Sequence, residues 1–159
     1  MGLFDNIGKK GNAGELRSFS YSPGYCDMMG AGHRDCLEKN DEGQWVFISR
    51  NRENHSEPFM VTTYAVDEVA AARFESFLKE RNLISLSKRL DSKEFVTDYS
   101  PWSYGIVFDC SKIGGSSFDD YCISQYRVYS KKDTELLKEI RDMFYALKGD
   151  VISEIEEKD

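Results

Sequence analysis

The sequence is poor in the residues and patterns that mark metal sites, membrane spans and secretion. Its 159 residues include four cysteines, and no two of them form the close pair typical of a zinc site. It has two histidines, and no apolar run approaches the roughly 20 residues that a membrane helix needs. The N-terminus lacks the apolar segment and small-residue cleavage site of a secretory signal. We therefore expect a cytoplasmic protein without a metal ion or cofactor, for which membrane binding is disfavoured.

Positive charge is also scarce. The formal net charge is −7 and the sequence pI is about 5.0. Nucleic-acid binding rests on an excess of Lys and Arg that neutralises phosphates, so the composition argues against nucleic acid as a partner. An acidic surface keeps a protein in solution, and it can also steer the protein toward a basic partner. Both interpretations stay open, and the composition does not fix the oligomeric state.

The composition is that of a globular domain. Apolar residues make up 40% of the chain, charged residues 31% and aromatic residues 13%, and the length suits one domain. Glycines and polar residues predict a flexible tail over 1–14, followed by a single domain over 15–150. The acidic end, 151–159, contains Val151, Ile152 and Ile155, and we expect a short helical turn or a disordered tail there.

Apolar–polar alternation predicts strands in the first half of the chain. The clearest case is the stretch in which Phe19 and Tyr21 alternate with serines. A turn signal at Asn40-Asp41-Glu42-Gly43 indicates that neighbouring strands are joined by a hairpin. The expected strands of this meander are 16–21, 33–39, 45–50 and 59–66.

The second half of the chain predicts a helix, a hairpin and a closing helix. Asp67 is a good N-cap for a helix that ends at Asn82, and no period dominates 83–96. Strands are expected at 104–110 and 121–129. An apolar stripe from Leu136 to Leu147 marks the last helix, with Asp133 or Thr134 as its cap and Gly149 as its stop. The fold class is therefore α+β, with an antiparallel sheet of about five to six strands and two helices on one face.

Catalysis by a cysteine–histidine pair has weak support in the sequence. His33 lies near Asp35 and Cys36, but residues three apart on a strand point to opposite faces. Cys26, Cys110 and Cys122 could meet a histidine only through the fold, and His55 lies among carboxylates. No local signature of a thiol enzyme is present, so we assign no catalytic residues and no metal ligands. Buried free thiols are the simplest account of the cysteines.

The aromatic residues are the best candidates for a binding surface. Tyr99, Trp102 and Tyr104 cluster around a proline, and aromatic side chains bury a large area at low entropic cost. Packing of the same residues onto the sheet edge as core is the alternative. A sheet covered on one side only could also present aromatic residues on its other face. The aromatic residues expected on that face are Tyr21, Tyr25, Trp45, Tyr121, Tyr126 and Tyr129, and the proposed binding set is Tyr99, Trp102, Tyr104, Trp45 and Tyr126.

Two short motifs carry a resemblance to other proteins. The opening Met-Gly-Leu-Phe-Asp and the strand Arg17-Ser-Phe-Ser-Tyr21 resemble a group of small, uncharacterised bacterial α+β proteins. The resemblance implies a tail, a meander, a helix, a hairpin and a closing amphipathic helix. Some members of the group carry a zinc ribbon that is absent here. The resemblance implies no activity and no catalytic residues.

These observations favour a non-enzymatic protein-interaction module that binds a basic protein. The first alternative is a small hydrolase or transferase that uses a Cys/His pair. The second is a peripheral membrane protein docked by its N-terminal turn, in which Leu3, Phe4 and Ile7 share a face.

Overall fold

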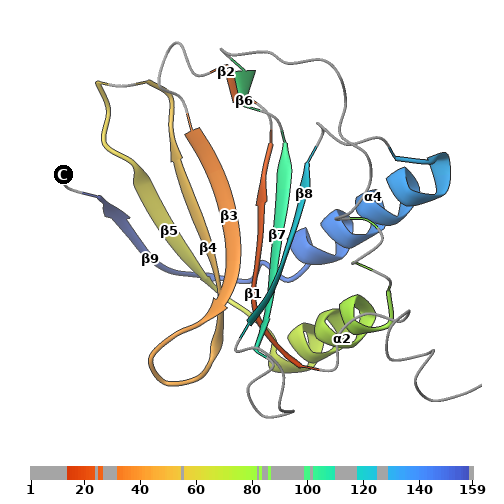
Figure 1. Cartoon of the computed structure of the whole chain (residues 1–159). Coiled ribbons are helices and arrows are strands. Elements are labelled where there is room, and N and C mark those ends of the chain that lie inside the picture. Colours follow the sequence, from red (N-terminus) through yellow and green to blue (C-terminus); the bar gives the residue numbers. More distant parts are fainter. Residues whose placement is uncertain are drawn as a thin grey trace, which may run out of the picture.

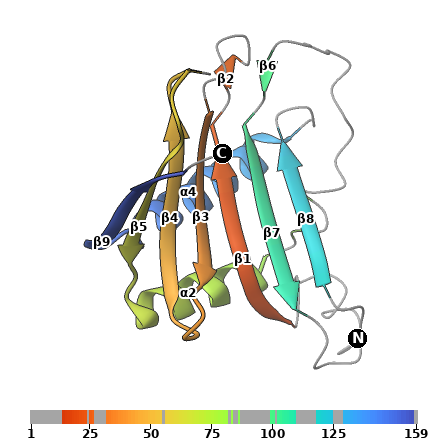
Figure 2. The ribbon, with the colours of Figure 1, turned by 90° about the vertical axis from the view of Figure 1, so that its left-hand side faces the viewer.

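In the computed structural model, one antiparallel sheet carries two helices of the described part of the chain on the same face (Figure 1). The structure describes residues 14–23, 25–26, 32–54, 56–81, 83, 86, 99–100, 102–109, 118–124 and 129–157. The main sheet has the strand order β8-β7-β1-β3-β4-β5-β9, which Figure 2 shows with the helices behind it. Its strands are β1 Glu15–Ser22, β3 Gly32–Lys39, β4 Trp45–Arg52, β5 Met60–Ala65, β7 Ser103–Asp109, β8 Phe118–Ser124 and β9 Val151–Glu156. A separate short pair joins β2 Tyr25–Cys26 to β6 Tyr99–Ser100, and the helices are α2 Glu68–Lys79 and α4 Lys131–Tyr145.

The predicted meander and hairpin are both present. Strands β1, β3, β4 and β5 are neighbours in chain order. The β3–β4 turn is fixed by Asn40, whose Oδ1 accepts hydrogen bonds from the backbone N–H groups of Glu42 and Gln44, each 3.0 Å long. Gly43 in this turn has a φ of 81°, a conformation that favours glycine. The β7–β8 hairpin then adds to β1, far away in the sequence, with Ile106 opposite Phe19.

The core lies between the sheet and the helices. A row of residues that oppose one another across the strands faces α4, and its members are Ile106, Phe19, Leu37 and Phe47. Phe144 of α4 packs on this row, with its ring 4.6 Å from that of Phe19 and 4.8 Å from that of Phe47. The aromatic residues therefore lie largely in the core, where each ring buries a large apolar area.

The helices begin and end for local reasons. Asp67 caps α2 as predicted, since its Oδ1 accepts a hydrogen bond from the Val69 N–H at 3.0 Å. The predicted cap of α4 was wrong by a few residues. Ser130 takes that place, and its Oγ accepts from the Asp133 N–H at 3.1 Å. Helix α4 ends at Tyr145, so Gly149 lies in the connection to β9 rather than at the helix end.

The acidic end of the chain forms a strand, which corrects the expected helical or disordered tail. Val151–Glu156 is β9, and it pairs with β5. Gly149 starts this pairing, because its N–H donates to the Ala65 carbonyl at 2.9 Å. The apolar spacing of Val151, Ile152 and Ile155 suited a helical turn, but the edge of β5 offered the backbone partners that favour a strand. Within the described residues the main sheet therefore has seven strands, one more than the upper expectation.

The face of the sheet turned away from the helices mixes polar and apolar residues where the structure describes it, because the register also places Val46, Ile48 and Val107 there. Ser18 and Ser20 on β1 and Arg34 and Cys36 on β3 alternate with core residues and point to this face. The expected aromatic face is wrong for three residues. Tyr21 and Trp45 lie on the helix side of the sheet and are buried, and Tyr129, just before α4, packs against the same core. The side chains of Tyr25 and Tyr121, and the whole of Tyr126, lie outside the described residues.

Candidate functional site

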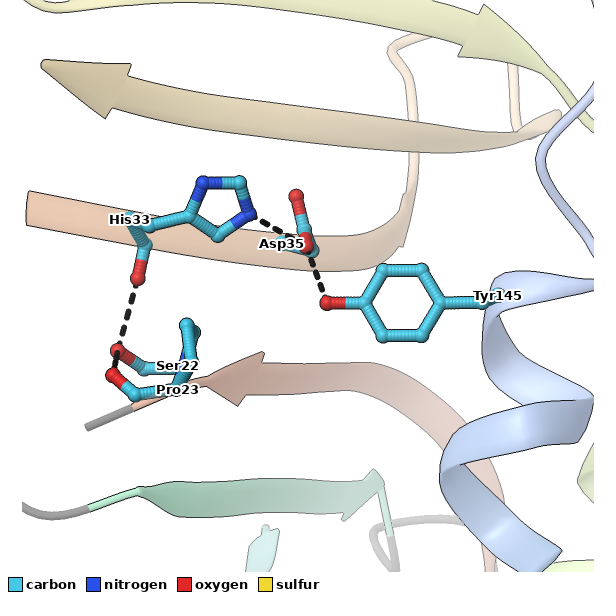
Figure 3. A network of polar contacts seen from close by, with 5 residues as sticks. All are labelled: Ser22, Pro23, His33, Asp35 and Tyr145. Carbon is cyan, nitrogen blue, oxygen red and sulfur yellow. Dashed lines mark hydrogen bonds and ion pairs between the residues drawn. The ribbon is translucent and has the colours of Figure 1, made fainter. Parts of the chain in front are cut away.

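A buried carboxylate, Asp35, organises a polar network between the sheet and the end of α4 (Figure 3). His33 Nε2 lies 2.8 Å from Asp35 Oδ2, and Tyr145 Oη donates to the same oxygen at 2.5 Å. The Asp35 side chain is 3% exposed, whereas that of His33 is 40% exposed. The network therefore links a buried charge to a histidine that reaches solvent.

The strand period explains how these residues meet. His33 and Asp35 are two residues apart on β3, so their side chains share the helix-covered face. Tyr145 stands at the last turn of α4 and reaches Asp35 across the helix–sheet interface. Ser22 of the neighbouring strand donates from its Oγ to the His33 carbonyl at 2.8 Å, which fixes the start of β3 (Figure 3).

The electrostatics of the network keep Asp35 charged. Burial alone would raise the pKa of Asp35, but hydrogen bonds from His33, Ser49 and Tyr145 outweigh burial and lower it. The hydrogen bond to Asp35 raises the pKa of His33 above 6.5, against the opposing effects of burial and Lys148. Burial, followed by the bond to Asp35, raises the pKa of Tyr145, so its hydroxyl stays protonated and donates.

A histidine oriented by a buried carboxylate can act as a general base, and a nucleophile within its reach would complete a catalytic site. Cys36 does not supply one, because it points to the opposite face of β3 from His33. Burial raises the pKa of Cys36 to about 12, so it is a thiol, and its Sγ donates toward Glu38 Oε2 at 3.7 Å. His55, Cys110 and the side chains of Cys26 and Cys122 lie outside the described residues.

Next to this network, four aromatic side chains line a cleft between α4 and strands β1 and β7. The cleft has a volume of about 290 Å³. Tyr21 and Tyr104 lie opposite each other on paired strands, with ring centroids 4.9 Å apart. Trp102 packs 5.6 Å from Tyr104 and 6.0 Å from Tyr129, which precedes α4. Helix α4 supplies the other wall, whose lining residues are Thr134, Glu135, Leu137, Lys138 and Arg141.

Polar contacts hold the walls of the cleft together. Tyr104 Oη donates to the buried Leu137 carbonyl at 3.0 Å, which joins β7 to α4. A hydrogen bond with Tyr21 raises the pKa of Arg141, whose guanidinium carbon lies 5.9 Å from the Tyr21 ring centroid. The ring centroids of Tyr21 and Tyr145 are 6.2 Å apart, and Tyr21 lies opposite Asp35 in the sheet. The cleft and the polar network are therefore adjacent, with Tyr21 between them.

The structure brings together part of the predicted binding set. Trp102 and Tyr104 both line the cleft, as part of one packed aromatic cluster. Trp45 does not belong to it: alternation along β4 turns Trp45 toward the start of α2, where its backbone N–H donates to Glu68 and its side chain is buried. Tyr126 and the side chain of Tyr99 lie outside the described residues.

Sequence reasoning missed the contribution of α4 to the cleft. Arg141 and Lys138 face the aromatic cluster, yet on the sequence they read as the polar face of an amphipathic helix. Tyr21 and Tyr129 were expected on the other face of the sheet. They line the cleft because β7 lies beside β1 in the sheet. No local sequence pattern reveals that strand order.

Within the described ranges, no group of three His, Cys, Asp or Glu side chains could hold a metal ion. The same part of the chain contains no helix with the length and apolar character of a membrane span. No family model, curated protein or solved structure matches the chain.

Proposed function

We propose that the protein is a non-enzymatic interaction module that binds a basic partner protein and takes one of its apolar or aromatic side chains into the cleft. The observation that carries this proposal is the cleft itself, where Trp102, Tyr104 and Tyr129 meet Arg141. Tryptophan, tyrosine and arginine are the residues most enriched among those that dominate binding energy at protein interfaces.

The size of the cleft favours a side chain as its occupant. Pockets for small ligands and cofactors usually span about 300–1,000 Å³, and this cleft, at about 290 Å³, lies at the lower limit of that range, a size that a single side chain can fill. Four aromatic residues line it, and α4 contributes Arg141 and Lys138 together with Glu135. An aromatic ring with a carbonyl or carboxylate beside it suits both parts of this lining.

The overall charge supports a partner that is basic outside this anchor. The chain carries a formal charge of −7, and a field of that sign accelerates encounters with a positively charged surface. The two contributions act on different rates. Charge acts mainly on association and is weakened by salt, whereas a buried anchor acts mainly on dissociation.

The alternative function, a Cys/His hydrolase or transferase, has less support. The His33–Asp35 pair would provide a base and the group that orients it. However, Cys36 lies on the other face of the sheet, and its pKa of about 12 disfavours the thiolate. The N-terminal turn needed for membrane docking lies outside the described residues.

Affinity capture with matched variants tests the proposed function. The immobilised full chain is compared with Trp102→Ala, which removes an aromatic side chain from the lining of the cleft, and with Val69→Ala, which shortens an exposed side chain of α2. We expect a basic protein that wild type and Val69→Ala retain, that Trp102→Ala loses, and that higher salt releases faster. Retention of the same proteins by Trp102→Ala, once its fold is verified by circular dichroism, would refute the role of the cleft.

A further inference from the structure

Among the residues that the structure describes, strand β9 is an unpaired edge of the sheet with unusual surface chemistry. It is the last strand in the order β8-β7-β1-β3-β4-β5-β9 (Figure 2), and all six of its residues are exposed. Within the described ranges, four large apolar residues are strongly exposed. Three of them, Val151, Ile152 and Ile155, belong to β9 at 58%, 60% and 60% exposure. Such a strand is a template for pairing with another chain.

The register shows which backbone groups of β9 face outward. Glu156 opposes Met60, and the next residue, Glu157, donates its N–H to the Phe59 carbonyl at 2.8 Å. Along an antiparallel strand, successive residues direct their N–H and C=O groups alternately toward and away from the neighbouring strand. The backbone groups of Glu154 and Glu156 therefore point away from β5, toward a chain that would add at this edge.

Both ends of β9 are anchored, so the edge is preformed. At the start, the Ala65 N–H donates to the Asp150 carbonyl at 2.8 Å. At the end, the Arg50 guanidinium donates to the two carboxylate oxygens of Glu157 at 2.6 and 2.9 Å. The Phe59 ring supports Arg50, whose guanidinium carbon lies 3.6 Å from the ring centroid. A preformed strand lowers the entropic cost of adding a partner.

The charges of β9 select the kind of strand that can pair with it. Lysine and proline, which commonly protect sheet edges, are absent from Val151–Glu156, and its charged residues are Glu154 and Glu156. Pairing with a second copy about Glu154 would place Glu154 opposite Glu154, and like charges in that position are destabilising. Opposite charges in the same position are favourable, so a basic strand complements this edge.

We propose that β9 is a docking strand for an extended basic segment of a partner protein. The segment adds an eighth strand, with Lys or Arg opposite Glu154 and Glu156 and an apolar side chain beside Ile155. The backbone of the segment forms hydrogen bonds with the outward N–H and C=O groups of Glu154 and Glu156. The site is separate from the aromatic cleft, which lies between α4 and strands β1 and β7. Experiments can therefore refute either binding proposal without refuting the other.

A labelled peptide tests the proposal directly. The probe is fluorescein-Lys-Val-Lys-Val-Lys-Val, with the same peptide carrying Glu for Lys as its counterpart, and fluorescence anisotropy reports binding to the full chain. We expect saturable binding of the Lys peptide, weakened about tenfold or more by the double variant Glu154→Lys/Glu156→Lys. The matched double variant Glu42→Lys/Glu139→Lys, which has the same net charge, should bind nearly as well as wild type. Equal losses in both double variants would overturn the proposal, because they would indicate attraction to net charge alone.

A second pair of variants separates strand addition from electrostatics. Glu154→Ala and Glu154→Pro both remove the carboxylate, but only proline also removes the outward N–H, and proline is tolerated at a strand edge when that group faces solvent. We expect Glu154→Pro to abolish binding and Glu154→Ala to retain most of it. Hydrogen exchange should show new protection at the amides of Glu154 and Glu156 when the peptide binds.

Three results would overturn the proposal. The first is equal binding by Glu154→Pro and Glu154→Ala, and the second is protection that arises elsewhere in the chain. The third is a dimer in light scattering in which the Glu154 and Glu156 amides are already protected, since a second copy would then occupy the edge. The variant Trp102→Ala should bind the peptide like wild type, which separates failure of this site from failure of the cleft.

Discussion

The hydrogen bond from Tyr145 to Asp35 can be removed with very little change in shape. The variant Tyr145→Phe deletes the hydroxyl and keeps the ring. The centroid of this ring lies 5.1 Å from that of Phe144 and 5.9 Å from that of Phe47. A hydrogen bond to a charged group contributes about 1.5–3 kcal/mol to stability. Because Asp35 is 3% exposed, water cannot easily replace the lost donor, and we expect a loss in that range. At roughly 2–4 °C per kcal/mol for a chain of this size, the melting temperature should fall by roughly 3–12 °C.

Urea unfolding followed by circular dichroism measures this loss, and a double-mutant cycle assigns it to the pair. The single variants Tyr145→Phe and Asp35→Asn are compared with the double variant. If the two groups interact as the geometry indicates, the double variant loses less stability than the sum of the single losses, by at least about 0.5 kcal/mol. Additive losses, or a loss below about 0.5 kcal/mol in Tyr145→Phe, would refute the assignment of Asp35 as the charged centre of the network.

Three further predictions concern the network, the β9 connection and the thiol. Because the pKa of Asp35 is lowered from 3.8 and that of His33 is raised from 6.5, the pair should contribute most between these values. Its contribution is lost as pH falls through the Asp35 pKa, and also as pH rises through the His33 pKa; urea midpoints of wild type and His33→Gln should converge at both extremes. In Gly149→Ala, the added Cβ would lie 2.5 Å from the backbone oxygen of Ala65, so we expect a loss of about 1–3 kcal/mol in urea unfolding, and an unchanged midpoint would contradict the close approach. With a pKa of about 12, Cys36 should react with iodoacetamide at pH 8 far more slowly in the folded chain than in urea, and equal rates at Cys36, read by mass spectrometry, would show an exposed thiolate.

Much of the fold follows from local patterns. Alternation of Phe19 and Tyr21 with serines predicted β1, and the Asn40–Gly43 turn predicted the β3–β4 hairpin. The place of the β7–β8 hairpin beside β1 did not follow, because strand order depends on which free edges meet in space. The strand at Val151–Glu156 was missed for a related reason, since its partner β5 lies about 90 residues earlier.

The candidate site, like the fold, could be predicted from the sequence only in part. Trp102 and Tyr104 stood out as aromatic residues near a proline, and the structure places both at the cleft. The spacing of His33 and Asp35 shows that they share a face, but it does not reveal that Asp35 is buried or that Tyr145 reaches it from 110 residues away. Burial and distant partners are properties of the packed chain, so the polar network could be found only in the structure.

Fluorescence of Trp102 tests most directly whether the cleft binds a side chain. The chain has two tryptophans, and the side chain of Trp45 at the start of β4 is buried, so the variant Trp45→Phe leaves Trp102 as the single reporter. This variant is titrated with N-acetylphenylalaninamide, and N-acetylalaninamide serves as the matched control. We predict a saturable change in Trp102 emission with the phenylalanine compound, a much smaller change with the alanine compound, and loss of the response when Tyr104→Ala opens the cleft. An identical, linear response to both compounds would contradict a side-chain binding site in the cleft.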